Sequence, residues 1–279
     1  MTASQTLGAG HATVDGVLAD SRRRRYRQLP AVAAALVLVA LACGYAGVLD
    51  PARYADALGT LLTLAWDAMP PDFSRWQHWG RPLLETLSMS VAGTALGLAA
   101  ALPLGALAAR TIAPSWIGVP VRLLLNTSRS IPTLVWGILF VAAVGFGPLP
   151  GVLALACHST GMLGKFCGEI LEHVDPAPGD ALRSQGVTRL GVLRFSVWPQ
   201  ILPRLIDVAV YRWEHNLRAA TTLGVVGAGG LGLEIVTAFH LFEYREALAL
   251  ILVLLGLVTL INTTGASIRG RLIRPERPI

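Results

Sequence analysis

Two long stretches of this sequence are almost free of charge, and they restrict the folds open to the chain. Residues 86–109 contain no charged side chain, and residues 131–164 contain none apart from the titratable His158. About 20 apolar residues in a helix are enough to cross the roughly 30 Å hydrocarbon layer of a membrane. The chain is 53% hydrophobic and 14% charged, whereas an ordinary soluble domain carries about 25% charged residues. We therefore predict an all-α polytopic membrane protein, whose net charge of +6 does not indicate nucleic-acid binding.

Six segments are predicted to span the membrane as helices. The glycine and proline residues at 145–151 indicate a tight turn, which divides the longest apolar stretch into two spans. A short cytoplasmic-side helix near 119–127 is expected before them. The six spans are residues 30–49, 83–109, 130–146, 148–167, a segment that begins near Val197, and 247–268.

The distribution of Lys and Arg predicts which side of the membrane each loop faces. One side carries sixteen: five in the amino-terminal arm, three between the second and third spans, four at 165–194 and four after Ile268. The other side carries four. Because cytoplasmic loops are enriched in these residues, both termini are predicted to be cytoplasmic. The parts of the chain are then a basic cytoplasmic arm (1–29), the first span with a periplasmic amphipathic segment (30–81), a core of five spans (82–272) and a cytoplasmic tail (273–279).

A polar, arginine-bearing insert separates the fourth and fifth spans. It reads DALRSQGVTRLGVLRFSVWP from Asp180 to Pro199, with Gly186 six residues after Asp180. We predict a cytoplasmic docking helix over about residues 180–195, on which an external motor can act. The phosphate-binding pattern G-x-x-x-x-G-K-[ST] occurs nowhere in the 279 residues, so a partner must supply any nucleotide energy.

The fifth span is unusually polar for a membrane segment. An ionised group at the bilayer centre costs roughly 2.5 to 3.5 kcal/mol, so this span must pack its polar side chains against protein or water. Arg204 can pair with Asp207, and Glu214 with Arg218, at helical spacings of three and four. Two interpretations stay open: the polar side chains hold helices together, or they line a water-filled route for a polar solute such as an anion. The candidates for such a route are Arg212, Glu214, Asn216, Arg218 and His158.

A glycine run follows the fifth span and matches the dinucleotide-binding pattern G-x-G-x-x-G. That pattern requires a preceding strand in a soluble βαβ unit, whereas a charged helix precedes it here. We predict instead a break in the helix near the outer face, where irregular backbone can border a cavity. The gate candidates are Gly227, Gly229, Gly230 and Gly232.

No residue is assigned to catalysis or to a metal. The spacing of Cys157, His158, Cys167 and His173 matches no usual metal-ligand pattern. A membrane-embedded metal protein or enzyme built around His158 and His173 is the alternative from another functional class.

Several segments of the sequence resemble one family of membrane proteins. Asp180-Ala181-Leu182, Gly186 and Pro199 are similar to the cytoplasmic signature of ABC importer membrane subunits, in which E-A-A precedes a glycine and a later proline. The segments 129–136, 153–165 and 211–220, with the glycine run, resemble the permease subunit of phosphonate-type ABC importers. That group includes phosphite and hypophosphite systems, and the resemblance covers residues 80–272.

The resemblance implies a type I ABC importer permease fold in the bacterial inner membrane. It further implies a homodimer of this chain, two cytoplasmic ATPase subunits that bind ATP and Mg, and a periplasmic binding protein that delivers the oxyanion. The chain itself would carry no cofactor. The residues implied to couple the chain to the ATPase are Asp180, Ala181, Leu182, Gly186, Arg189 and Pro199. A related permease for methionine or another amino acid is the nearest alternative.

Overall fold

The computed structural model describes residues 28–272, and within them every regular element is helical. The predicted cytoplasmic arm, up to residue 27, and the tail from residue 273 lie outside the described residues. The chain forms two compact units that divide after Trp66. The elements are a helix at Gln28–Tyr45, η1 Pro51–Tyr54, α2 Ala57–Asp67, η2 Trp76–His78, α3 Gly80–Ala108, α4 Ser115–Ser130, α5 Thr133–Val144, α6 Pro148–Glu172, α7 Ala177–Ser184, α8 Arg189–Val192, η3 Leu193–Val197, α9 Trp198–Gly224, α10 Gly230–His240 and α11 Tyr244–Leu272.

The first unit contains the first predicted span. Its helix ends at Tyr45, earlier than the predicted residue 49. Gly47 follows with φ of +72°, a left-handed conformation that an α-helix does not contain. The predicted amphipathic segment at 50–81 is divided among η1, α2, η2 and the start of α3.

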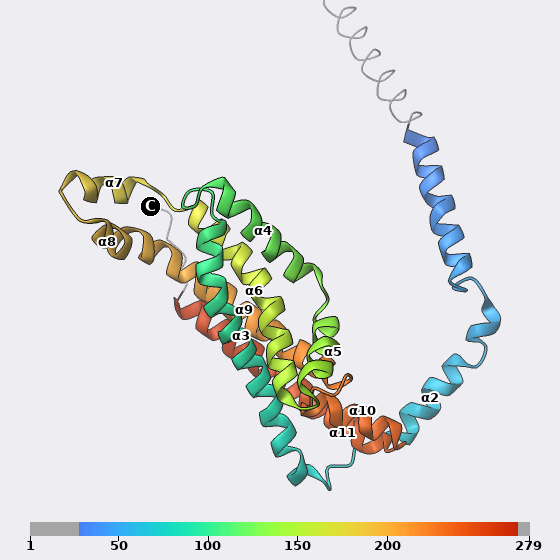
Figure 1. Ribbon diagram of the computed structural model, residues 1–279. Helices are drawn as coiled ribbons and strands as arrows, with labels where there is room; N and C mark the ends of the chain where they lie inside the picture. The colour runs from blue at the N-terminus through green and yellow to red at the C-terminus, as the bar shows by residue number, and fades with distance from the viewer. Residues whose placement is uncertain (1–27, 273–279) are drawn as a thin grey trace, which may run out of the picture. The chain divides into compact units, whose positions relative to one another are not determined.

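The second unit is built on a parallel pair of helices, α3 and α6, which run side by side in Figure 1. Gly93, Gly97 and Gly105 of α3 face α6, and a Cβ added at Gly97 would lie 2.6 Å from Cβ of Ser159. Small residues at such spacings let two helix backbones approach closely, which is how membrane helices gain packing energy. The helix pair therefore forms a fixed frame, against which α4, α5 and α9 pack.

The glycine run joins α9 to α10 and confirms the predicted helix break. Gly227, Gly229 and Gly230 have φ of +88°, +81° and +72°, which side-chain-bearing residues adopt only with strain. Gly232 serves a different purpose, since a Cβ there would overlap the backbone of Thr221 in α9. The run allows the chain to reverse and α10 to pack tightly against α9. No strand precedes it within residues 28–272, as a dinucleotide site would require.

Three described helices are long and apolar enough to cross a membrane: Gln28–Tyr45, Trp76–Ala108 and Tyr244–Gly270. The helices α4 and α5 meet the same test only as a pair, bent by 89°. The helices α6 and α9 are 25 and 27 residues long but too polar for that test. Six spans therefore stay a prediction, whereas the helical membrane architecture is confirmed.

The third predicted span, 130–146, differs from the structure. Only Thr133–Val144 is helical in this direction, and 12 residues of helix are about 18 Å long. Pro132 starts the new helix, because proline cannot continue the hydrogen-bonding ladder of α4. The short helix expected near 119–127 instead extends to Ser130. Arg129 consequently lies against Gly161, in the middle of α6, rather than in a cytoplasmic loop.

The predicted docking helix is two short helices rather than one. Its first part is α7, its second part begins with α8, and Gly186 lies at the turn between them with φ of +80°. The amide of Gly186 donates to the carbonyl of Arg183, and that of Val187 to Leu182. These two bonds form a Schellman motif, which ends a helix at a left-handed glycine. From Arg189 the chain then runs without interruption through η3 into α9.

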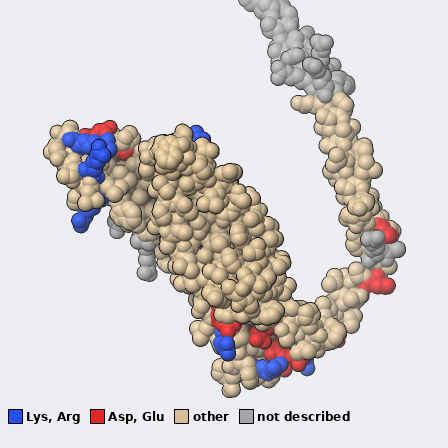
Figure 2. Space-filling model, viewed as in Figure 1, with Lys and Arg blue, Asp and Glu red and all other residues tan. Residues whose placement is uncertain are grey.

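Charged side chains gather at the two ends of the second unit. Figure 1 shows α7 and α8 projecting from one end of the helix bundle, and Figure 2 shows Lys and Arg concentrated on them. At the opposite end Arg75 pairs with Glu243 and Glu246, and Arg81 with Glu85. The visible surface between the ends is almost free of charge (Figure 2), as the side of a membrane-embedded bundle should be.

Candidate functional site

Two hydrogen bonds hold the break between α4 and α5 against the middle of α6, and a third joins α5 to α4. Ser128 Oγ donates to the carbonyl of Cys157 over 2.6 Å, and Trp136 Nε1 donates to the carbonyl of Ser128 over 3.2 Å. His158 Nδ1 lies 3.1 Å from the carbonyl oxygen of Ile131. The break is therefore a fixed feature, and residues 157–161 of α6 mark its depth in the bundle.

A buried polar network lies at the same depth, where α9 crosses α3 and α6. Ser159 Oγ accepts hydrogen bonds from Arg212 Nε and Asn216 Nδ2, each over 2.9 Å. Asn216 Nδ2 also donates to Thr94 Oγ1 over 2.9 Å. Arg212 is only 3% exposed, and its Nη2 atom has no hydrogen-bond partner. Such a buried, incompletely paired guanidinium is costly, and its positive charge extends into the surrounding bundle.

The acidic residues of α9 do not pair as the sequence predicted. Arg269 of α11 lies 2.8 Å from Glu214 Oε1 and 3.9 Å from Asp207 Oδ1. A Cβ at Gly265 would overlap the Glu214 carboxylate, so a glycine is needed where α11 approaches. Glu214 thus joins two helices, which fits the structural interpretation of the polar span for this residue. The predicted Glu214–Arg218 and Arg204–Asp207 pairs are wrong, because local spacing cannot reveal a partner on α11.

A cavity of about 260 Å³ lies between α9 and the start of α5. Its polar lining comes from Thr133 on α5 and from His215, Arg218 and Thr222 on α9. Arg218 is exposed, and within residues 28–272 its guanidinium forms no ion pair. His215 is half-buried and lies within electrostatic range of His158, Arg212 and Arg218. The structure thereby brings four basic side chains together beside the helix break.

His215 and Thr133 were not among the predicted site residues. The spacing of Tyr211, His215, Arg218 and Thr222 places them on one face of a helix, and this was the available signal for His215. Thr133 had no comparable signal, because its place depends on the fold of the α4–α5 pair.

The predicted glycines lie around a larger cavity just beyond the carboxyl-terminal end of α9. Gly227 and Gly229 are among the residues that line about 950 Å³ of space between α3, α10 and the α5–α6 turn. The amide of Gly230 donates to Glu85 Oε2 over 3.1 Å, and the amide of Leu231 to Thr86 Oγ1 over 2.9 Å. The start of α10 is therefore attached to α3, and the glycine run borders a cavity as expected.

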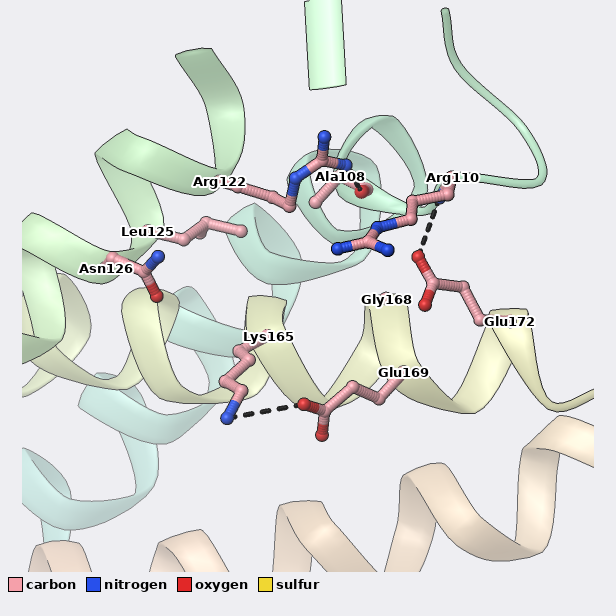
Figure 3. Close-up of a pocket in the computed structure, with 9 residues that line it drawn as sticks. All are labelled: Ala108, Arg110, Arg122, Leu125, Asn126, Lys165, Gly168, Glu169 and Glu172. Atoms are coloured by element: carbon pink, nitrogen blue, oxygen red, sulfur yellow. Dashed lines mark hydrogen bonds and ion pairs between the residues drawn. The ribbon is translucent and has the colours of Figure 1, made fainter. Parts of the chain in front are cut away.

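A third cavity, of about 220 Å³, lies where the ends of α3 and α6 meet the middle of α4 (Figure 3). Each of its three basic residues has a local partner, through its side chain or its backbone amide. Lys165 pairs with Glu169 over 3.3 Å, and Glu172 accepts a hydrogen bond from the amide of Arg110 over 2.7 Å. Arg122 donates to the carbonyl of Ala108, which joins α4 to α3. These contacts join the ends of α3 and α6 and attach the middle of α4 to α3.

The docking segment presents an exposed surface made of both polar and apolar side chains. Asp180 and Arg183 form an exposed ion pair of 3.0 Å on α7, and Ala181 lies beside them. Arg189 begins α8, and Leu190 is 74% exposed. Pro199 lies outside this surface, at the start of α9. The structure thus groups Asp180, Ala181, Gly186 and Arg189 in one hairpin, with Leu182 closing the turn.

The two histidines of the metal-protein alternative lie too far apart to share an ion. His173, at the C-cap of α6, lies 15 positions after His158, which corresponds to about 22 Å along the helix. The imidazole of His173 contacts the carbonyl of Glu169, one turn earlier. Among the described residues, no three His, Cys, Asp or Glu side chains are arranged to hold a metal.

The chain is similar in sequence and in fold to membrane subunits of known transport systems. Residues 101–275 match the family described as binding-protein-dependent transport system inner membrane component. The chain is 49% identical to the phosphite transport system permease protein PtxC of Stutzerimonas stutzeri, over 88% of this chain and 89% of that protein. It is 38% identical to the phosphate-import permease protein PhnE of Mycolicibacterium smegmatis, over 81% of this chain and 43% of that protein. The inward-facing MetNI methionine ABC transporter has a similar fold, with a TM-score of 0.62, 24% identity, and coverage of 70% and 96%.

Proposed function

This chain belongs to the family of binding-protein-dependent transport system inner membrane components, and from that premise we propose that it forms the membrane pathway for phosphite or a related phosphorus oxyanion. It is a transport permease subunit rather than an enzyme. We choose this solute because the chain is 49% identical to a phosphite permease over nearly the whole of both chains. The cluster of His158, Arg212, His215 and Arg218 supports an anionic solute, because its two guanidinium groups supply positive charge at mid-depth in the bundle and its imidazoles can donate hydrogen bonds.

The proposed complex contains two copies of this chain, two cytoplasmic ATPase subunits and a periplasmic binding protein. ATP and Mg bind to the ATPase, and this chain holds no cofactor. The α7–α8 hairpin, with Asp180, Ala181, Leu182, Gly186 and Arg189, is the proposed contact with the ATPase. Its exposed Leu190 fits this role, since an unpartnered apolar side chain favours a protein interface.

The proposed orientation in the bacterial inner membrane places the hairpin and both termini in the cytoplasm. The basic end of the second unit supports this arrangement, because positive charge favours the cytoplasmic side (Figure 2). The opposite end carries the Arg75, Glu243 and Glu246 group and the cavity beside the glycine run. In this arrangement residues 82–272 form the permease core, and residues 30–81 form the first transmembrane helix and a periplasmic segment.

The hairpin is connected to the pathway candidates by one continuous helical segment. From Arg189 through η3 to Gly224 the chain remains helical, and this segment carries Arg212, Asn216 and Arg218. Movement of the hairpin by the ATPase can therefore displace α9 as a rigid element, in the manner of rigid-body switching. Gly227 and Gly229, at the far end of α9, are the proposed gate.

Uptake by the reconstituted complex tests this proposal. The chain, its ATPase and its binding protein would be placed in liposomes, and ATP-dependent accumulation of phosphite, phosphate, methylphosphonate and methionine would be compared. We expect accumulation of at least one phosphorus oxyanion and none of methionine. Accumulation of methionine alone would reject the proposed solute while leaving the transport role intact.

A further inference from the structure

The position of Arg218 is difficult to explain by packing alone. It lies two residues after Asn216, which binds Ser159 at the middle of α6, so it is about 3 Å further along the bundle axis. Yet its side chain is exposed, and no described carboxylate forms an ion pair with it. An arginine exposed to lipid at this depth would cost several kcal/mol. Water or a bound anion beside the guanidinium would remove that cost.

The acidic residues that could neutralise this region are engaged elsewhere. Asp207 and Glu214 both lie against Arg269 of α11. The face of α9 toward α5 is left with His215 and Arg218, and the buried Arg212 adds a further positive charge behind them. The fold thus separates the charges of α9, negative toward α11 and positive toward the cavity.

The other wall of the cavity also favours an anion. Thr133 and Leu134, the first two residues of the 12-residue helix α5, line it. The amino-terminal end of a helix carries a partial positive charge and presents amide groups that can bind anions. The helix end contributes here beside a guanidinium, an imidazole and the hydroxyl groups of Thr133 and Thr222. All these groups can donate hydrogen bonds to oxygen.

We propose that this cavity is an oxyanion-binding site within the permease, in which Arg218, His215 and Thr133 contact a tetrahedral phosphorus oxyanion. The inference rests on the proposed function and specifies where the solute binds. Arg218 supplies paired N–H donors to two oxygens, a geometry for which guanidinium groups are well suited. The cavity volume of about 260 Å³ is several times the ~30 Å³ share of one water molecule in the liquid, which leaves room for a small hydrated anion.

Direct binding of phosphite to the permease–ATPase complex in nanodiscs, without the binding protein, tests this site. We expect saturable binding, which Arg218→Gln weakens by about tenfold to a hundredfold, because a charged hydrogen-bonding group is lost. His215→Gln and Thr133→Val should each weaken it less, and Arg218→Lys should retain part of the affinity. Lys165→Gln, on α6 outside both this cavity and the hairpin, is the matched control and should not change the affinity.

The result that would overturn the site is phosphite binding that stays unchanged in Arg218→Gln, His215→Gln and Thr133→Val. Absence of binding to the wild-type complex would also reject it. Neither result would contradict the proposed function if the complete system still accumulated phosphite. Conversely, binding without ATP-dependent uptake would support the site and reject the importer. Unfolding temperature and complex yield would show that each variant is folded, which Arg218 should allow because it is exposed.

Discussion

The two faces of α9 show how one helix can serve two purposes. Toward α11, Glu214 and Asp207 share Arg269, and the charges are compensated across a close helix contact. Toward α5, His215 and Arg218 line a cavity, and no ion pair joins Arg218 to a described residue. Compensated charge stabilises a contact, whereas uncompensated charge attracts a ligand. The difference predicts that substitutions on the first face mainly affect folding, and those on the second face mainly affect transport.

The largest effect on stability is expected from Glu214→Ala. This change leaves Arg269 without its nearest carboxylate, and breaking a buried ion pair costs about 3 to 5 kcal/mol. Since Arg269 is 26% exposed, we expect about 2 to 3 kcal/mol, seen as reduced complex yield and a lower unfolding temperature. Glu169→Ala breaks the exposed Lys165 pair and should cost less than about 1 kcal/mol. Equal losses in the two variants would remove the distinction between the buried and exposed pairs.

Arg218→Gln should reduce transport strongly and leave the stability of the protein almost unchanged. We expect uptake of phosphite to fall at least about tenfold, because the cavity loses its exposed positive charge. The unfolding temperature should stay close to that of the wild type, because Arg218 makes no described ion pair. Initial uptake rates and thermal unfolding would be measured on the same preparations. A variant that transports normally but unfolds early would invert the roles assigned to the two faces.

Gly186→Val tests the link between the hairpin and α9. The residue has φ of +80°, and a β-branched side chain there costs roughly 1 to 3 kcal/mol of local strain. We expect stimulation of ATP hydrolysis by the loaded binding protein to fall several-fold, with the permease core still folded. Gly270→Ala is the control, because Gly270 lies in α11 with free space where its Cβ would be. Unchanged stimulation in Gly186→Val would argue against coupling through this turn.

The substitution expected to disturb the protein least is Arg189→Cys, which reports the side of the membrane that the hairpin faces. Arg189→Cys, in a background with Cys43→Ser and Cys157→Ser, should react with a membrane-impermeant thiol reagent only after the cytoplasmic side is opened. The remaining Cys167 is buried and should react little. Labelling would be compared in intact and lysed spheroplasts. Reaction in intact spheroplasts would reverse the proposed orientation and place the cationic hairpin outside the cell.

The sequence predicted correctly those helix breaks that depend on the backbone preference of a few neighbouring residues. The break at Gly227–Gly230 follows from residues that tolerate left-handed backbone, and Gly186 ends a helix for the same reason. The docking segment was nevertheless predicted as one helix, because its helical residues outweighed a single glycine. The third span was misplaced for a related reason: Pro132 stands within a continuous apolar run, and hydropathy alone cannot show an 89° bend.

The membrane class, the helical secondary structure and the family motifs were determined by the sequence itself, because transfer of apolar side chains and local backbone preferences depend on residue type. Which charges meet was decided only by the tertiary structure. Glu214 was expected to pair with Arg218, one turn away, but lies against Arg269 on another helix. The partner of a buried charge is set by whichever helices pack beside it, and a close contact in water-poor surroundings outweighs proximity along the chain. That choice leaves Arg218 and His215 facing the cavity at the start of α5.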